Sequence, residues 1–130
     1  MFIETHNVHQ IKGEPVRRWF TDNDLELIVW LDKQKRIIGF QLCYEINRKL
    51  KALTWHENGG YLHSGIDDGE NKPGHHKATP VLIPDGEFDK ENIIKRFALS
   101  VASLPVEMTK FVTNKIKEFE TGINSSRLQL

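Results

Sequence analysis

The strictest pattern in this sequence is a two-residue alternation between residues 37 and 47. Large apolar or aromatic side chains occupy every second position, and the positions between them include glycine, glutamine and glutamate. Successive side chains of a β-strand point to opposite faces, so this segment is predicted to be a strand with one apolar face. Such a face must be covered by another layer of the protein. The residues of this face are Ile38, Phe40, Leu42, Tyr44 and Ile46.

Shorter segments with a related alternation lie on both sides of this strand, and turn-forming residues separate them. Successive strands that are joined by short turns are typical of an antiparallel meander. The segment 25–32 carries leucine and valine on one face, but Ile28 and Trp30 on the other. The predicted strands are 16–21, 25–32, 37–47, 50–56, 61–66 and 79–83. The predicted turns are 22–24, 33–36, 48–49 and 58–60.

The last third of the chain has helical periodicity. Asp89 is a predicted N-cap, and Phe88 and Ile93 flank it with the spacing of a hydrophobic staple. Apolar stripes predict helices over 89–103 and 105–120, because proline is accepted in the first turn of a helix but not in its interior. Gly122 is the expected residue after the second helix.

Strands followed by helices predict an α+β fold. We expect an antiparallel β-meander of four to six strands within residues 14–84, followed by two C-terminal amphipathic helices packed on one face. Residues 1–122 are predicted to form a single domain, and residues 123–130 a frayed tail. The predicted core contains Leu27, Val29, Phe40, Leu42, Leu53, Phe97, Val101, Met108, Phe111 and Val112.

The composition limits the classes of partner. Eighteen basic and 18 acidic side chains give a net charge of zero, which disfavours nucleic acid and anionic membrane surfaces as partners. No apolar run approaches the roughly 20 residues of a membrane span. The N-terminus lacks the basic and apolar regions of a signal peptide. The chain has one cysteine, Cys43, which is predicted to be an inert thiol. A cytoplasmic location is therefore expected.

Charged residues gather at the predicted turns. Alternate turns of a meander lie at the same end of the sheet, so the acidic turn 22–24 should lie beside the basic turn that holds Arg48, Lys49 and Lys51. The basic turn 33–36 should lie beside Glu57. We interpret these charges as solvated turn tips that discourage edge pairing. The alternative is that the basic turn forms a patch for a ligand.

Residues 56–76 are rich in histidine and carboxylate side chains, which bind zinc and related metals. Their spacing matches no known site, and an exposed loop with surface histidines is the simpler interpretation. A tight turn at 58–60 would bring His56 close to His63. The candidate catalytic residues are His56, His63 and Asp67, as a base with its orienting acid. The candidate metal ligands are His63, Asp68, His75 and His76.

No catalytic or cofactor-binding motif emerges, so we expect no cofactor and do not favour an enzyme. Two helices cover only one face of a sheet, and the other face carries Ile28 and Trp30. We therefore expect a non-enzymatic self-associating or protein-binding module, with a homodimer interface at Ile28 and Trp30. A monomer would need residues 2–16 or 57–78 to cover that face. The alternative function is a metal-binding protein or a hydrolase-like enzyme that uses residues 56–76.

Overall fold

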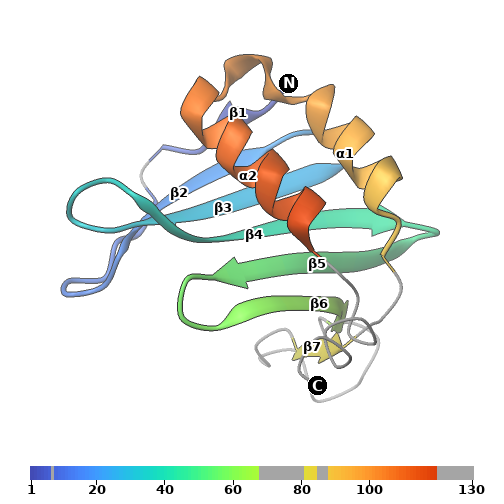
Figure 1. The fold of residues 1–130 in the computed structure, drawn as a ribbon, viewed down its shortest axis with the longest axis horizontal. Coiled ribbons are helices and arrows are strands. Elements are labelled where there is room, and N and C mark those ends of the chain that lie inside the picture. The colour runs from blue at the N-terminus through green and yellow to red at the C-terminus, as the bar shows by residue number, and fades with distance from the viewer. Residues whose placement is uncertain (7, 68–80, 85–87, 120–130) are drawn as a thin grey trace.

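The computed structural model describes residues 1–6, 8–67, 81–84 and 88–119. Within these residues, seven antiparallel strands follow one another across a single sheet in chain order, and the helices lie on one face of it (Figure 1). The strands are β1 (Ile3–Glu4), β2 (Val16–Thr21), β3 (Leu25–Leu31), β4 (Ile37–Ile46), β5 (Lys49–His56), β6 (Gly60–Asp67) and β7 (Val81–Pro84). The helices are α1 (Lys90–Ala98), the 3₁₀ turn η1 (Val101–Ser103) and α2 (Val106–Glu118).

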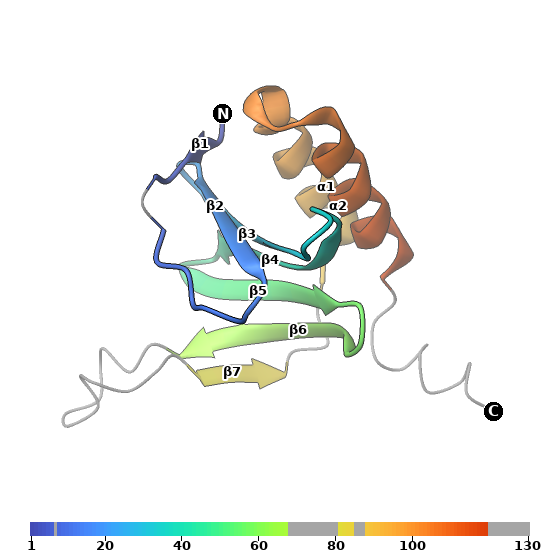
Figure 2. The same cartoon turned by 90° about the vertical axis from the view of Figure 1, so that its left-hand side faces the viewer.

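The α+β meander with two C-terminal helices is confirmed. The six predicted strands correspond to β2 through β7, and both helices pack on the same side of the sheet (Figure 2). The sequence pattern did not predict β1, because two residues are too few to show an alternation. We call the face under the helices the inner face and the opposite one the outer face.

Two hairpin turns show how local chemistry sets the strand order. Asn47 and Arg48 both have left-handed backbone angles, with φ of 52° and 64°, as a two-residue type I′ turn requires. The predicted turn at 48–49 was therefore one residue late. Gly60 has φ of 71° and closes the turn that follows His56, where glycine carries no steric penalty.

The structure shows one of the two predicted pairs of charged turns, that of the turn 33–36 with Glu57. An Arg36 Nη2 lies 4.0 Å from an Oε1 of Glu57 at one end of the sheet. At the other end, the Arg96 guanidinium of α1 donates to the backbone carbonyls of Glu45 at 3.1 Å and Asp24 at 3.5 Å. Arg96 thereby ties two turns of the sheet to the first helix.

The core lies between the inner face and the two helices. Eight of the ten predicted core residues are buried, while Val101 and Phe111 are only half-buried. The predicted helix 89–103 was too long: α1 ends at Ala98, so Val101 lies in η1 and leaves the apolar stripe. Phe111 packs at the margin of the core, where its ring centroid lies 5.4 Å from the ring centroid of Trp55.

The ends of the helices were predicted in part. The Asp89 side chain accepts the Asn92 N–H at 3.2 Å, which confirms the predicted N-cap of α1. The second helix ends at Glu118 rather than at residue 120. Gly122 and the expected tail at 123–130 lie outside the described residues.

The first residues of the N-terminal segment pack on the helix side, whereas residues 9 and 10 contact Arg17 of β2, whose guanidinium donates to the His9 carbonyl at 2.5 Å. Phe2 is buried against Phe97, with ring centroids 5.9 Å apart. Its N–H donates to the Ser100 carbonyl at 2.9 Å, and the Ser103 hydroxyl donates to its carbonyl. Ile3 and Ile11, which a covering segment would bury, are exposed.

Replacing Phe97 tests the core. Phe97→Ala should lower the free energy of unfolding by about 3–5 kcal/mol, because the side chain is 1% exposed and its removal leaves a cavity. Leu99→Ala, at a position 85% exposed, should change it by less than about 0.5 kcal/mol. Urea denaturation of both variants measures the difference, and equal effects would contradict this account of the core.

Candidate functional site

The outer face carries a row of aromatic rings around a glycine. Trp30 of β3 pairs with Gly39 of β4, which in turn pairs with His56 of β5. The Trp30 and His56 rings approach to 5.2 Å between centroids. A Cβ on Gly39 would lie 2.6 Å from His56 Nδ1 and 3.0 Å from the Trp55 carbonyl oxygen. Glycine at this position therefore gives the His56 ring the space that it occupies.

The next cross-strand row of the outer face runs from Trp19 on β2 to Leu62 on β6. It exposes less apolar surface than the sequence indicated. Trp19 is half-buried, and its cross-strand partner Ile28 is only 8% exposed. At the far side of the row, Leu62 is 39% exposed. Of the two predicted interface residues, Trp30 therefore offers more accessible surface than Ile28.

Opposite charges mark the two ends of this face. Arg17 pairs with Trp30 at one end, and Glu26 pairs with Thr21 at the other. Both charged side chains are half-buried. The outer face thus runs from a basic end to an acidic end, with Trp19 between them.

The edge of the sheet at β2 is already occupied. The Thr5 N–H donates to the Trp19 carbonyl at 2.7 Å. Further along, the Gln10 side-chain amide accepts the Arg17 N–H at 2.9 Å and donates to the Arg17 carbonyl at 2.8 Å. These contacts satisfy backbone groups that a further strand would otherwise use.

The inner face has a polar corner where its apolar pattern ends. We use this name for Tyr44, Lys51 and His63, which the register places on the helix side of β4, β5 and β6. The Tyr44 hydroxyl lies 2.5 Å from His63 Nε2, and both side chains are buried. The Phe88 ring lies 4.9 Å from the His63 ring. All three polar residues make additional interactions, so none of them is without a partner.

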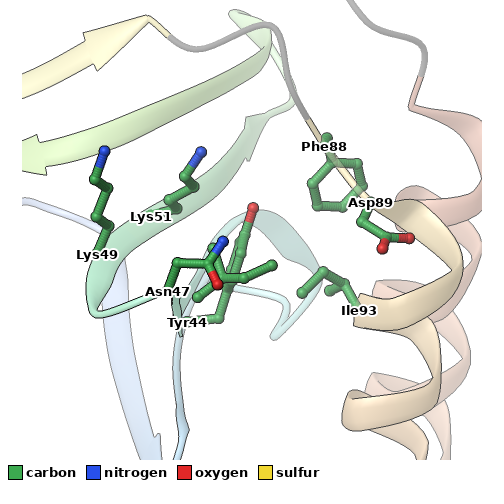
Figure 3. Close-up of a pocket in the computed structure, with 8 residues that line it drawn as sticks. Tyr44, Asn47, Lys49, Lys51, Phe88, Asp89 and Ile93 are labelled. Atoms are coloured by element: carbon green, nitrogen blue, oxygen red, sulfur yellow. The ribbon is translucent and has the colours of Figure 1, made fainter.

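A hollow of about 220 Å³ opens beside this corner, under the start of α1 (Figure 3). Lys49 and Lys51 extend from β5 on one side of it, and Asp89 and Ile93 of α1 lie on the other. The Asp89 carboxylate is held by its N-cap hydrogen bond to the Asn92 N–H. The lining residues are Tyr44, Ile46, Asn47, Lys49, Lys51, Phe88, Asp89 and Ile93.

The structure separates the candidate catalytic residues. His56 pairs with Gly60 and His63 with Leu53, so the two histidines lie on opposite faces of the sheet. The hypothesis that the turn brings them together is therefore wrong. Asp67 lies at the far end of β6, roughly 23 Å along the strand from Gly60 at a rise of ~3.3 Å per residue. The backbone of Asp67 therefore lies far along the sheet from His56, which pairs with Gly60.

Of the four candidate metal ligands, one lies within the described residues. His63 lies in the polar corner, whereas Asp68, His75 and His76 lie outside the described residues. Within the described ranges, no group of three or more histidine, cysteine or carboxylate side chains is placed to hold a metal ion.

The sequence does indicate the polar corner, but only once the inward-facing positions of β5 and β6 are known. Lys49 and Lys51 lie an even number of residues from the buried Leu53, so they share its face of β5. His63 shares its face of β6 with Tyr61 for the same reason. Lys51, which is half-buried at a helix-facing position, violates the rule that the covered face of a strand is apolar. Such local violations occur at functional sites.

Cys43 lies on the outer face between Glu26 and Ala52. Burial, and secondarily the negative charge of Glu26, raise the pKa of the Cys43 thiol from 9.0 to about 12. The thiolate is the reactive form of cysteine, so the thiol should be unreactive at neutral pH.

Alkylation kinetics test this expectation. At pH 8, iodoacetamide should modify Cys43 in the folded protein on the order of a thousandfold more slowly than in urea, because the thiolate fraction falls with the raised pKa. Glu26→Gln should accelerate the reaction modestly, since the Glu26 charge is the smaller cause. Equal rates in the folded and unfolded protein would show an accessible, unperturbed thiol.

Comparison of the chain with protein-family models, with curated proteins and with solved structures finds no match. In the described part of the chain, neither helix combines the length and the apolarity that a membrane crossing requires.

Proposed function

We propose that the protein is a cytoplasmic, non-enzymatic module that self-associates into a homodimer through the outer face of its sheet. The observation that carries this proposal is the row of Trp30, Gly39 and His56, which lies on the face opposite both helices. Tryptophan is a frequent anchor of protein interfaces. A single cysteine supports a reducing compartment.

Because the backbone groups at the β2 edge are already bonded, we favour the outer face as the contact surface. Edge-to-edge association would need free backbone groups on that strand, and residues 3–5 and Gln10 already pair with them. Association through side chains of the outer face needs no such rearrangement. Toward β6 the accessible apolar surface narrows, since Ala52 and Ser64 are small and buried. We therefore place the contact around β2 and β3.

The charges of the outer face favour a second copy as the partner. Consider a two-fold axis that runs across the strands through Trp19 and Ile28. It places the basic end of one copy, at Arg17, over Thr21 of the partner subunit, one strand away from Glu26 of the partner subunit, and the reverse contact follows by symmetry. Trp19 lies close to the axis in this arrangement. A face with opposite charges at its two ends is thus complementary to itself.

The oligomeric state tests the interface. At tens of micromolar, light scattering should give twice the chain mass of 15.1 kDa for the wild type. Trp30→Glu should give 15.1 kDa, because the interface would then bury an unpaired charge. Leu99→Glu, on the helix side, is the matched control and should remain dimeric. Circular dichroism confirms that each variant is folded. A monomeric wild type would overturn the proposal.

Charge reversal tests the direction of the two-fold axis. Arg17→Glu and Glu26→Arg should each weaken dimerisation roughly tenfold or more, since each creates two like-charge contacts per dimer. The double variant should recover most of this loss, because the pairs re-form with exchanged signs. A double variant that is weaker than either single variant would exclude this arrangement of the two copies.

A further inference from the structure

We propose that the hollow beside the polar corner binds a small organic monoanion, with its carboxylate at the lysines and a short apolar body against the opposite wall. The site lies on the helix side of the sheet, away from the outer face. This inference therefore does not depend on the homodimer.

The first observation is the placement of positive charge. Lys49 and Lys51 extend from β5 and line one side of the hollow, where Lys49 is exposed and Lys51 half-buried (Figure 3). Lys51 has interactions of its own, so the proposal rests on Lys49. No carboxylate of the described residues forms an ion pair with Lys49. An exposed ammonium group at the rim of a cavity attracts an anion.

The second observation is that the other residues that line the hollow form an apolar group and a polar group. Ile46, Phe88 and Ile93 supply apolar surface, which a simple inorganic ion would leave uncovered. The side chains of Asn47 and Tyr44 supply hydrogen-bonding groups between this surface and the lysines. A ligand with an anionic end and an apolar body matches both parts.

The third observation limits the charge and the size of the ligand. Asp89 lines the hollow at the start of α1, and its negative charge would repel a second negative charge on that side. A volume of about 220 Å³ is below the roughly 300–1,000 Å³ of sites for drug-sized molecules. The ligand class is therefore a small monocarboxylate with an alkyl or aromatic group.

An NMR titration of the full chain tests the proposal, with phenylacetate as the probe. Phenylacetate should shift the backbone amide signals of residues 44–51 and 88–93 and should saturate. Phenylacetamide has the same shape without the charge and should bind at least about tenfold more weakly. Inorganic phosphate, which has charge without an apolar body, should not reproduce the shifts.

Matched lysine variants assign the charge. Lys49→Gln should weaken phenylacetate binding about three- to tenfold, as expected for loss of one partly solvated charge contact. Lys49→Arg should retain most of the affinity. Lys33→Gln removes the same charge from the turn at the opposite end of the sheet and should have no effect. The amide spectrum of each variant reports whether it is folded.

Several outcomes would overturn the inference. They are the absence of saturable shifts at tens of millimolar phenylacetate, equal binding of phenylacetamide, and equal binding of phosphate. Equal effects of Lys33→Gln and Lys49→Gln would also overturn it, because binding would then reflect the overall charge rather than this hollow.

Discussion

The packing of α1 and α2 onto the inner face of β3, β4 and β5 is the constraint on which the other features depend. Val29, Phe40, Leu42 and Leu53 lie under the helices with no accessible surface. Burial of a side chain of this size contributes about 1.5–3 kcal/mol. Because side chains alternate along a strand, burial of these residues also determines the position of their neighbours. Gly39, Gln41 and Cys43 must then face outward.

The polar corner lies where this apolar packing ends. Beyond Leu42 and Leu53, the inner face continues with Tyr44 and Lys51, and α1 begins above them. The short contact between Tyr44 and His63 satisfies polar groups that would be costly to bury without partners. Arg96 holds α1 to the turns at this end, and Asp89 and Phe88 lie across the hollow from the lysines. The hollow is therefore a consequence of where the helix starts.

The two proposed contact surfaces have opposite positions and different chemistry. The outer face presents flat aromatic surface at Trp30 and His56, which suits another protein surface. The hollow is small and concave, with Lys49 at its rim, which suits a small molecule. Residues 53–56 of β5 illustrate the separation, since Leu53 and Trp55 face the helices while Thr54 and His56 face outward. Substitutions on one face should therefore affect the other only through the stability of the sheet.

The sequence by itself determined the order of strands and helices, because alternation, turn residues and the N-cap Asp89 act over a few residues. It also indicated the apolar face of each strand, since the alternation of side chains between two faces depends only on neighbouring residues. Only the tertiary structure decided how distant segments meet. The register of β5 with β6 placed His56 and His63 on opposite faces, and helix packing brought Phe2 against Phe97. Lys49 met Asp89 across the hollow for the same reason. Contacts between segments far apart in the chain depend on register and packing, which no local pattern specifies.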